Sequence, residues 1–316
     1  MPAACSIRVR GVVQGVGFRP FVYRLASANT LTGWVLNAGE GVEIHLEGSE
    51  QGREAFLRDL KAKPPTAASI TAIEIEPANA EGFHDFTIRE SLQQRRPTVR
   101  ISPDLPVCDD CLSELFDPND RRHRYPYINC TNCGPRYTVI TSLPYDRPNT
   151  TMREWALDSY CSAEYQDPGN RRFHAQPVAC PNCGPAYYLH EEGKTTAEHH
   201  QALLRTVRLL NDGKIVAIKG LGGYHLACSA RDSIAAMRAR KFRKEKPFAL
   251  MVRDLTVARQ LVALSANAEA LLTSAARPIV LAPAKVHWDE VAPENDELGV
   301  MLPYTPLHHL LFTAGS

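Results

Sequence analysis

"GVVQGVGFRPFVYRLA", residues 11–26, decides the fold of the first part of the chain, because it joins two periodicities through a loop of glycines. Ile7, Val9 and Val13 lie at odd-numbered positions, and arginines lie at even-numbered positions between them. This alternation of apolar and polar residues has the period of a β-strand. From Pro20 onward the apolar residues recur at helical spacing, and proline suits the first turn of a helix. The stretch therefore predicts a strand, a glycine loop and a helix N-terminus.

The loop between these elements, residues 14–19, carries the features of an anion site. Backbone N–H groups at the start of a helix lack intrahelical partners, and the helix dipole is positive there. Glycine lets the backbone approach an oxyanion closely, and the planar guanidinium of Arg19 fits a phosphate with two hydrogen bonds. The alternative is a tight turn followed by a surface arginine, and the neighbouring pattern favours the anion site.

That neighbouring pattern predicts five more elements before residue 90. Four stretches have the pattern of a strand, and one stretch has helical periodicity. The predicted strands are 33–37, 42–47, 70–76 and 83–89, and the predicted helix is 51–62. The order βαββαβ is that of a ferredoxin-like sandwich. A turn at residues 38–41 joins the second and third strands, and Asn37 lies at its start.

The middle of the chain is rich in proline and cysteine. Six of the nine cysteines form three Cys-x-x-Cys pairs, and no signal-peptide pattern precedes them, so metal binding is favoured over disulfides. Four cysteines have the spacing of a zinc ribbon and can close a tetrahedron around zinc: Cys108, Cys111, Cys130 and Cys133. We expect a structural zinc ion there.

A second copy of this pattern follows fifty residues later, because "NCTNCGPRY" at 129–137 is echoed by "ACPNCGPAY" at 179–187. The offset maps the first four cysteines onto Asp158, Cys161, Cys180 and Cys183. A carboxylate is a legitimate but harder zinc ligand, so the second site holds zinc, holds it weakly or is empty. His174 is a possible substitute ligand. We predict a second zinc ion, with Asp158 as its least certain ligand.

The last third of the chain alternates helical and strand patterns. Residues 198–211 predict a helix, and residues 214–228 predict a short buried strand that runs into a glycine turn. A basic stretch, "RARKFRKEKPFALMV" at 238–252, precedes another strand. Four cations can gather around the phosphates of a nucleotide: Lys219, Lys241, Arg243 and Lys246. The alternative is a solvated cationic end of a helix.

Two motifs in the first part resemble the acylphosphatase signature: "VQGVGFR" at 13–19 and "GWVLNAGEGVE" at 33–43. The resemblance covers roughly residues 5–90. It implies that Arg19 clamps the phosphoryl group of an acyl phosphate and that Asn37 orients the attacking water. It also implies a phosphate-binding loop that consists of Gln14, Gly15, Val16, Gly17 and Phe18. Positioning and charge neutralisation can carry most of such a reaction, because an acyl phosphate has a good leaving group.

The last third is similar to the start of the YrdC/Sua5 carbamoyl-adenylating domain. The stretches that match are "IVAIKGLGGYHLAC", "KFRKEKPFALMV", "RPIVL" and "LGVMLPYTPLHHLLF". The chain thus has an acylphosphatase-like part, a double zinc ribbon and a YrdC-like part, in this order. This order resembles the N-terminal portion of the HypF-type carbamoyltransferases, which mature nickel–iron hydrogenases. Lines such as "RRHRYPYINCTNCGPRYT" and "RRFHAQPVACPNCGP" make the resemblance close.

The resemblance implies an α+β multidomain protein with three parts. These are a ferredoxin-like acylphosphatase domain at 1–91, a double zinc-ribbon module at 92–190 and a partial α/β YrdC-like domain at 191–316. In the family, carbamoyl phosphate is hydrolysed at the first domain and the carbamate is adenylated at the third with ATP and Mg. The carbamoyl group then passes to the C-terminal cysteine of a HypE-type partner. Because the YrdC-like pattern stops early, we expect phosphatase activity, weak or no adenylation, and no transfer.

Composition sets further bounds. The formal net charge of the 316 residues is only +1, so no global field attracts a polyanion, and no apolar run reaches transmembrane length. We expect a cytoplasmic protein with no membrane or nucleic-acid partner. The interleaved arginines and aromatics at 121–127 and 171–173 keep open a zinc-ribbon RNA-binding or tRNA-modification protein. We favour packing as their role. A non-catalytic scaffold is the other alternative.

Overall fold

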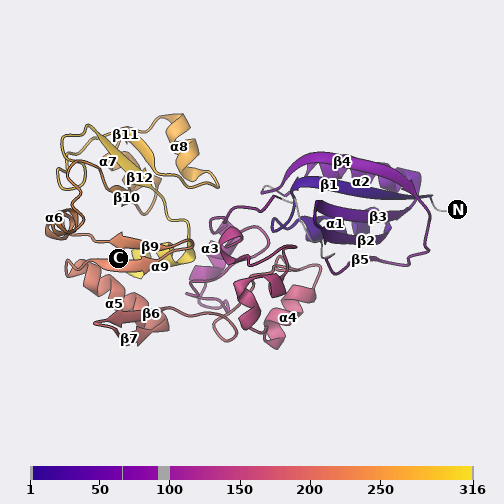
Figure 1. Cartoon of the computed structure of the whole chain (residues 1–316), viewed down its shortest axis with the longest axis horizontal. Coiled ribbons are helices and arrows are strands. Elements are labelled where there is room, and N and C mark those ends of the chain that lie inside the picture. The colour runs from indigo at the N-terminus through magenta and orange to yellow at the C-terminus, as the bar shows by residue number, and fades with distance from the viewer. Residues whose placement is uncertain (1–2, 66, 92–99, 315–316) are drawn as a thin grey trace. The chain divides into compact units, whose positions relative to one another are not determined.

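The computed structural model describes residues 3–65, 67–91 and 100–314 (Figure 1). The chain forms two compact units, one made of residues 1–104 and 129–184 and the other of residues 105–128 and 185–316. Both units mix helices and strands, so the α+β class is confirmed. None of the described helices combines the length and the apolar composition that a membrane crossing requires.

The first unit is built on a five-stranded sheet with the strand order β4-β1-β3-β2-β5 (Figure 1). Its strands are β1 (Ala3–Val12), β2 (Thr32–Ala38), β3 (Gly41–Gly48), β4 (Ser69–Ala78) and β5 (Phe86–Ile88). The pairs β1–β4, β1–β3 and β3–β2 are antiparallel, and the short β5 pairs parallel with β2. The predicted ferredoxin-like order is confirmed for β1 to β4, and β5 is an added edge strand.

Two helices, α1 (Phe18–Ala28) and α2 (Glu50–Ala62), pack against this sheet and against each other. Their apolar residues form one core with the alternating residues of the strands, and Phe56, Ile7 and Ile44 are fully buried there. Each side chain of this size contributes about 1.5–3 kcal/mol when it is buried. The core fixes the position of the loop between β1 and α1.

The cysteine-rich repeat is visible in the backbone. Helices α3 (Asp109–Phe116) and α4 (Ser159–Gln166) begin fifty residues apart. After each helix comes a residue with positive φ, Arg124 at 56° and His174 at 54°. Each donates its backbone N–H to a carbonyl in the last turn of its own helix, at 2.8 and 3.0 Å respectively. The repeat inferred from the sequence is therefore also a repeat of local structure.

Between α3 and α4 the first unit has only short 3-10 turns. They are η1 (Tyr137–Val139), η2 (Arg147–Asn149) and η3 (Thr151–Glu154). Two arginines of this region, Arg122 and Arg172, are buried, and the Arg172 guanidinium contacts the Asn129 carbonyl at 3.1 Å and Glu164 at 3.3 Å. The packing role is therefore supported for these two, whereas Arg124 is exposed.

The second unit contains one three-stranded sheet, ordered β10-β12-β11, and two hairpins, β6-β7 and β8-β9. Its strands are β6 (Tyr188–Glu191), β7 (Lys194–Glu198), β8 (Val216–Lys219), β9 (Tyr224–Ala227), β10 (Ala249–Met251), β11 (Val280–Pro283) and β12 (Glu297–Met301). Besides α3, its helices are α5 (His199–Asn211), α6 (Arg231–Arg240), α7 (Leu255–Leu261), α8 (Ala266–Thr273) and α9 (Pro306–Ala314). The sheet and α7 and α8 share an apolar core that includes Val300 and Leu272.

Candidate active site and metal centres

The loop after β1 needs glycine at two positions. Gly15 and Gly17 have φ values of 75° and 72°, in the left-handed region that other residues rarely adopt. A Cβ on Gly15 would lie 3.2 Å from the Arg136 side chain, and one on Gly17 would lie 3.1 Å from Thr131. Gly17 also caps α1, which begins at Phe18, two residues before the predicted start at Pro20. The loop thus brings the free N–H groups of the helix start against residues 131–136.

Arg19 and Asn37 line one pocket in the first unit. Arg19 comes from the first turn of α1, and Asn37 from the end of β2. Both side chains reach the backbone carbonyl of Tyr145, with Arg19 Nη2 at 3.5 Å and Asn37 Nδ2 at 3.3 Å. The pocket measures about 320 Å³, counting space open to solvent, and Gly15 and Gly17 also line it. Loop, guanidinium and carboxamide therefore converge.

The Asn37 side chain presents a buried acceptor to this region. Its Nδ2 donates to the Tyr145 carbonyl, but its Oδ1 accepts no hydrogen bond from any described residue. A buried acceptor without a partner is destabilising unless water or a ligand satisfies it. A water molecule held there would lie in the same pocket as the Arg19 guanidinium.

The Gln14 side chain holds the loop together. Its Nε2 donates to the carbonyls of Ala38 and Gly41 at 2.8 Å each, and its Oε1 accepts from the Tyr145 N–H at 3.2 Å. Its carboxamide is therefore used in fixing the turn after β2. Any contact that Gln14 makes to an anion would come from its backbone. Val16 and Phe18 are buried in the core, so only their backbone is available as well.

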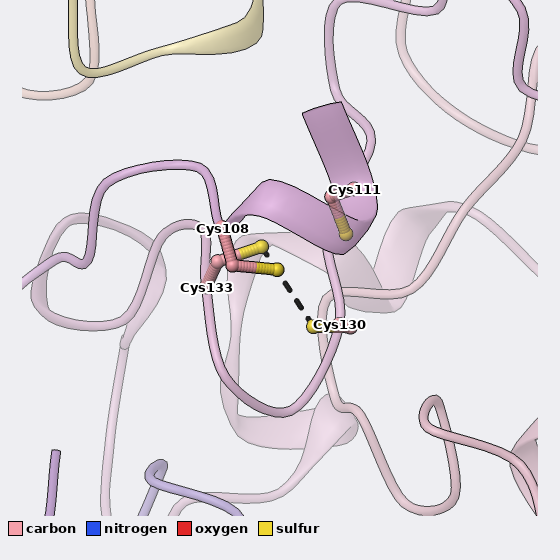
Figure 2. A group of neighbouring side chains, drawn as sticks. All are labelled: Cys108, Cys111, Cys130 and Cys133. Carbon is pink, nitrogen blue, oxygen red and sulfur yellow. Dashed lines mark hydrogen bonds between the residues drawn. The ribbon is translucent and has the colours of Figure 1, made fainter. Parts of the chain in front are cut away.

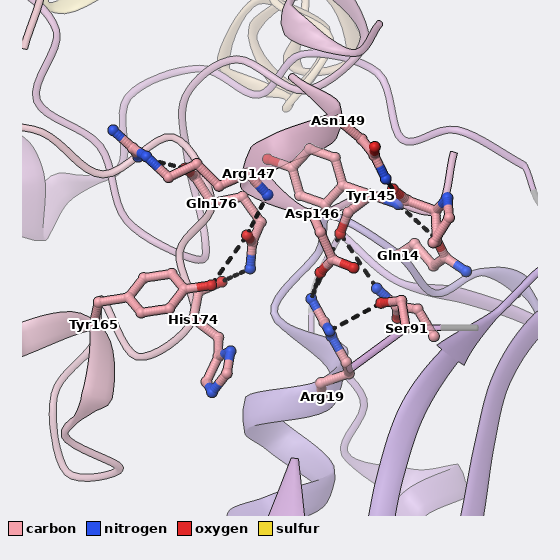
Figure 3. Close-up of polar contacts among 12 residues, drawn as sticks. Gln14, Arg19, Ser91, Tyr145, Asp146, Arg147, Asn149, Tyr165, His174 and Gln176 are labelled. Atoms are coloured by element: carbon pink, nitrogen blue, oxygen red, sulfur yellow. Dashed lines mark hydrogen bonds and ion pairs between the residues drawn. The ribbon is translucent and has the colours of Figure 1, made fainter. Parts of the chain in front are cut away.

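Arg19 is held by residues far away in the sequence (Figure 3). Its Nη2 lies 2.7 Å from Asp146 Oδ1, and its Nη1 lies 3.4 Å from Ser91 Oγ. The Arg19 side chain is only 8% exposed and that of Asp146 is 23% exposed. The ion pair keeps the guanidinium in one orientation within the pocket.

A second arginine lines the pocket, and the sequence did not indicate it. Arg136 is 2% exposed, and among the described residues its guanidinium donates only to backbone carbonyls. These belong to Gly15, Cys130, Thr131, Cys133 and Pro135. Among the described residues no carboxylate forms an ion pair with it. Arg136 therefore ties the glycine loop to the Cys130–Cys133 turn and places a positive charge beside the pocket. The Asp104 carboxylate accepts the Arg136 backbone N–H at 2.7 Å.

His174 also lines this pocket, and it is not part of either cysteine cluster among the described residues. Burial, the larger cause, and the nearby Arg19 guanidinium together lower the pKa of His174 to about 4, although Asp146 opposes the shift. The imidazole is therefore neutral at pH 7 and adds no charge to the pocket. The possibility that His174 replaces Asp158 as a metal ligand is not supported by this placement.

The first predicted cysteine cluster is assembled. Figure 2 shows Cys108, Cys111, Cys130 and Cys133 with their sulfur atoms facing one another, and all four sulfur atoms lie within 4.8 Å. The Cys130 and Cys133 sulfur atoms are 3.8 Å apart. Four ligands at the usual zinc–sulfur bond length in a tetrahedron would be separated by about 3.8 Å. The donor set and this spacing fit zinc.

The second cluster brings Asp158 together with Cys161, Cys180 and Cys183, again within 4.8 Å. Asp158 Oδ2 lies 3.2 Å from the Cys180 sulfur, and Cys180 and Cys183 are 3.6 Å apart. Burial opposes ionisation of Cys183, but hydrogen bonds from the backbone of Asp158 and Cys180 outweigh it and lower the pKa of that thiol. A thiolate is the form that binds metal. This cluster can also hold zinc.

Asp158 has a second role, because its Oδ1 caps α4 by accepting the Cys161 N–H at 2.8 Å. In the first repeat Cys108 occupies the same cap position, but its side chain does not accept a capping hydrogen bond from the start of α3. The fourth ligand position and the helix cap therefore coincide in both repeats.

The two roles of Asp158 can be separated by substitution. Asp158→Asn retains a good helix cap but removes the anionic ligand, so we expect zinc affinity at this cluster to fall by about tenfold to a hundredfold. Asp158→Cys restores the ligand set of the first repeat and should raise the affinity. Competition against a chelator of known affinity measures both. Unchanged affinity in the asparagine variant would make Asp158 a cap only.

The four cations predicted to bind a nucleotide have separate neighbours in the second unit. Lys219 Nζ lies 5.4 Å from the centroid of the Tyr224 ring, and the Arg243 guanidinium lies 4.8 Å from that of Phe248. Arg243 also donates to the carbonyls of Lys246 and Pro247. These contacts place Arg243 in the packing of its own loop. A nucleotide role for Lys219, Lys241, Arg243 and Lys246 stays a prediction.

Three comparisons place the chain among known proteins. Residues 5–88 match the acylphosphatase family model, residues 107–140 and 159–190 match the HypF finger, and residues 208–316 match the Sua5/YciO/YrdC model, described as telomere recombination. Carbamoyltransferase HypF2 of Cupriavidus necator is 51% identical over 314 residues, which cover 97% of this chain and 39% of that protein. An acylphosphatase of Thermotoga petrophila is 46% identical over 87 residues, 96% of its length and 27% of this chain.

The fold agrees with that relationship over the whole chain. The crystal structure of full-length HypF in its phosphate- and nucleotide-bound form superposes with a TM-score of 0.93 at 43% identity, covering 99% of this chain and 42% of that one. The chain thus spans about two fifths of the length of its HypF relatives. All three predicted regions have their counterparts in the order in which they were inferred. The chain belongs to the HypF carbamoyltransferase family.

Proposed function

We propose that the pocket of Arg19 and Asn37 hydrolyses acyl phosphates, with carbamoyl phosphate as the substrate. The observation that carries this proposal is convergence: the glycine loop, a buried guanidinium and a buried carboxamide line one pocket in the first unit. Arg19 would bind the phosphoryl oxygens, together with backbone N–H groups of residues 14–18 at the start of α1. The Asn37 Oδ1 would accept a hydrogen bond from the attacking water.

The chemistry requires no strong base. The water oxygen attacks phosphorus, and the bond between phosphorus and the acyl oxygen breaks, so the carbamate leaves with the electron pair. The dianion of carbamoyl phosphate and water yield carbamate and dihydrogen phosphate, and the total charge of −2 is conserved. Positioned hydrogen-bond donors stabilise the charge on the phosphoryl oxygens as this bond breaks. The match of residues 5–88 to the acylphosphatases supports this assignment.

Both cysteine clusters are proposed to hold structural zinc. Each offers four ligands, which is the closed set typical of structural rather than catalytic sites. The carbonyls of Cys130 and Cys133 accept hydrogen bonds from Arg136, which also donates to the Gly15 carbonyl. The metal would therefore support the glycine loop by fixing the position of Arg136.

For the last third, the proposal follows the relatives. Residues 191–316 would form part of a site for ATP with Mg and carbamate, after an acylphosphatase domain at 1–91 and a double ribbon at 92–190. The full-length HypF crystal structure in its phosphate- and nucleotide-bound form supports both a phosphate and a nucleotide site in the family. In the complete protein the carbamoyl group would pass to a HypE-type partner with a C-terminal cysteine.

The role of Asn37 provides a specific test of the hydrolysis. Asn37→Ala removes the acceptor for the attacking water, so kcat for carbamoyl phosphate should fall by about a hundredfold while KM changes little. Phosphate release measured by a colorimetric assay checks this, with Asn295→Ala, a substitution in the second unit, as a control. An equal loss of affinity for inorganic phosphate would show that Asn37 only shapes the pocket.

A further inference from the structure

We propose that Asp146 and the phosphoryl group of the substrate compete for the Arg19 guanidinium, so that Asp146 sets the affinity of the pocket for phosphoryl anions. This inference rests on the proposed function, because it takes Arg19 as the phosphoryl-binding residue. It assigns a role to the turn at residues 142–150, "SLPYDRPNT", which lies more than a hundred residues from Arg19 in the sequence.

The competition follows from how the donors of Arg19 are used. The contact of Nη2 with Asp146 Oδ1 at 2.7 Å is short and joins two charges. The other two contacts are longer, and their acceptors are uncharged. They join Arg19 to Ser91 Oγ at 3.4 Å and to the Tyr145 carbonyl at 3.5 Å. A bidentate contact from both terminal nitrogens would bring the phosphoryl dianion beside the Asp146 carboxylate, which lies 2.7 Å from Nη2. The repulsion between these like charges favours displacement of the carboxylate from Arg19.

Asp146 is placed so that it can leave. Among the described residues, Arg19 is the only polar partner of its carboxylate. Asp146 stands at the N-cap position of η2, but its side chain caps no N–H there. With 23% of the side chain exposed, the carboxylate can reach water after a rotation about its side-chain torsions. No other hydrogen bond of the carboxylate would be broken.

The charges beside the pocket favour the exchange. Arg19 and Arg136 supply two positive charges, and Asp146 pairs with Arg19 alone. The neutral His174 adds no charge. Among the described residues, Asp146 is the only carboxylate that forms an ion pair with either guanidinium, and the Asp104 carboxylate accepts the Arg136 backbone N–H at 2.7 Å. A phosphoryl dianion in the pocket would interact with both guanidinium groups. Without substrate, the single negative charge of the Asp146 carboxylate keeps the buried Arg19 guanidinium paired. A phosphoryl dianion carries two negative charges and would stabilise the guanidinium more strongly.

The same geometry has a second interpretation, in which Asp146 is a positioning residue that orients Arg19 and stays in contact with it during binding. The two interpretations predict opposite signs for the removal of the charge. If Asp146 competes, its neutralisation strengthens phosphate binding. If Asp146 positions Arg19, its neutralisation weakens phosphate binding.

The test is Asp146→Asn in the full 316-residue chain, with Asp59→Asn as the matched control. Asp59 pairs with Lys63 on α2, so its neutralisation changes the net charge equally without touching the pocket. Calorimetric titration with inorganic phosphate should show a Kd about tenfold lower for Asp146→Asn, because a charged hydrogen bond is replaced by a neutral one. KM for carbamoyl phosphate should fall by a similar factor, with kcat within about twofold.

An unchanged or higher phosphate Kd in folded Asp146→Asn would overturn the proposal. If the variant loses zinc or its cooperative thermal transition, a crystal structure of the unchanged chain with bound phosphate decides instead. The proposal requires Asp146 to have left the Arg19 guanidinium there, and an intact ion pair beside bound phosphate would refute it. Failure of the proposed function has a different signature, namely no phosphate binding and no hydrolysis by the unchanged chain.

Discussion

Replacing Arg19 with lysine should lower kcat/KM for carbamoyl phosphate by about a hundredfold to a thousandfold and leave the zinc content unchanged. Lysine keeps one positive charge but loses the planar fork that binds two phosphoryl oxygens. The Arg19 side chain is 8% exposed, so water cannot replace the lost hydrogen bonds in the pocket. Phosphate release and metal analysis on the same preparation measure the two quantities.

The control for this substitution is Arg58→Lys, the same change on the neighbouring helix α2, where the side chain is 71% exposed. It should alter neither activity nor zinc content. Asp146 can reach solvent in Arg19→Lys, but the ammonium of the shorter lysine side chain stays buried, so the free energy of unfolding should fall by about 1–3 kcal/mol. Parallel losses of activity, zinc and stability would make Arg19 a structural residue and would remove it from the proposed mechanism.

Removal of zinc should have the largest effect on stability. Residues 129–184 contain one α-helix and three short 3-10 turns, and they include six of the eight residues of the two clusters. Structural zinc supplies about 10–16 kcal/mol of binding free energy in small zinc domains, and that energy is lost on chelation. We expect this region to unfold when zinc is removed, as measured by near-ultraviolet circular dichroism and hydrogen exchange.

Phosphate binding should be lost together with zinc, because Arg136 connects the Cys130–Cys133 turn to the Gly15 carbonyl. Cys180→Ser tests the second cluster alone, with Cys228→Ser as the control, because Cys228 belongs to neither cluster. Cys180→Ser should bind one equivalent of zinc less and melt at a lower temperature. Undiminished phosphate affinity in the fully chelated chain would contradict the link between the metal and the loop.

Much of the first unit could be predicted from local pattern. The two-residue period of β1 and β3 and the helical period of α1 and α2 depend on which side chains face one core, so they are readable in the sequence. Gly17 shows the limit of this reasoning. Its left-handed conformation starts α1 at Phe18, whereas the proline pattern placed the start at Pro20.

The residues of the two clusters could be predicted for a different reason. The fifty-residue repeat carries the spacing of the first cluster onto the second, and it places Asp158 where the first repeat has Cys108. Repetition conveys three-dimensional information, because equivalent residues occupy equivalent places in each copy. The same register explains why Cys108 and Asp158 both stand at the cap of a helix.

The rest of the pocket could not be predicted, because it depends on contacts between distant segments. Tyr145, Asp146 and Arg136 reach the glycine loop over more than a hundred residues, and no periodicity marks them. The stretch "SLPYDRPNT" at 142–150, which contains Tyr145 and Asp146, has no pattern that assigns it a physical role. A buried arginine such as Arg136 looks in the sequence like any other arginine of a basic stretch.

The most direct test of the central claim is phosphate release from carbamoyl phosphate by the folded, zinc-loaded chain. Convergence of the glycine loop, Arg19 and Asn37 on one pocket predicts saturable release, competitively inhibited by inorganic phosphate. Release no faster than the spontaneous decomposition of carbamoyl phosphate would contradict it.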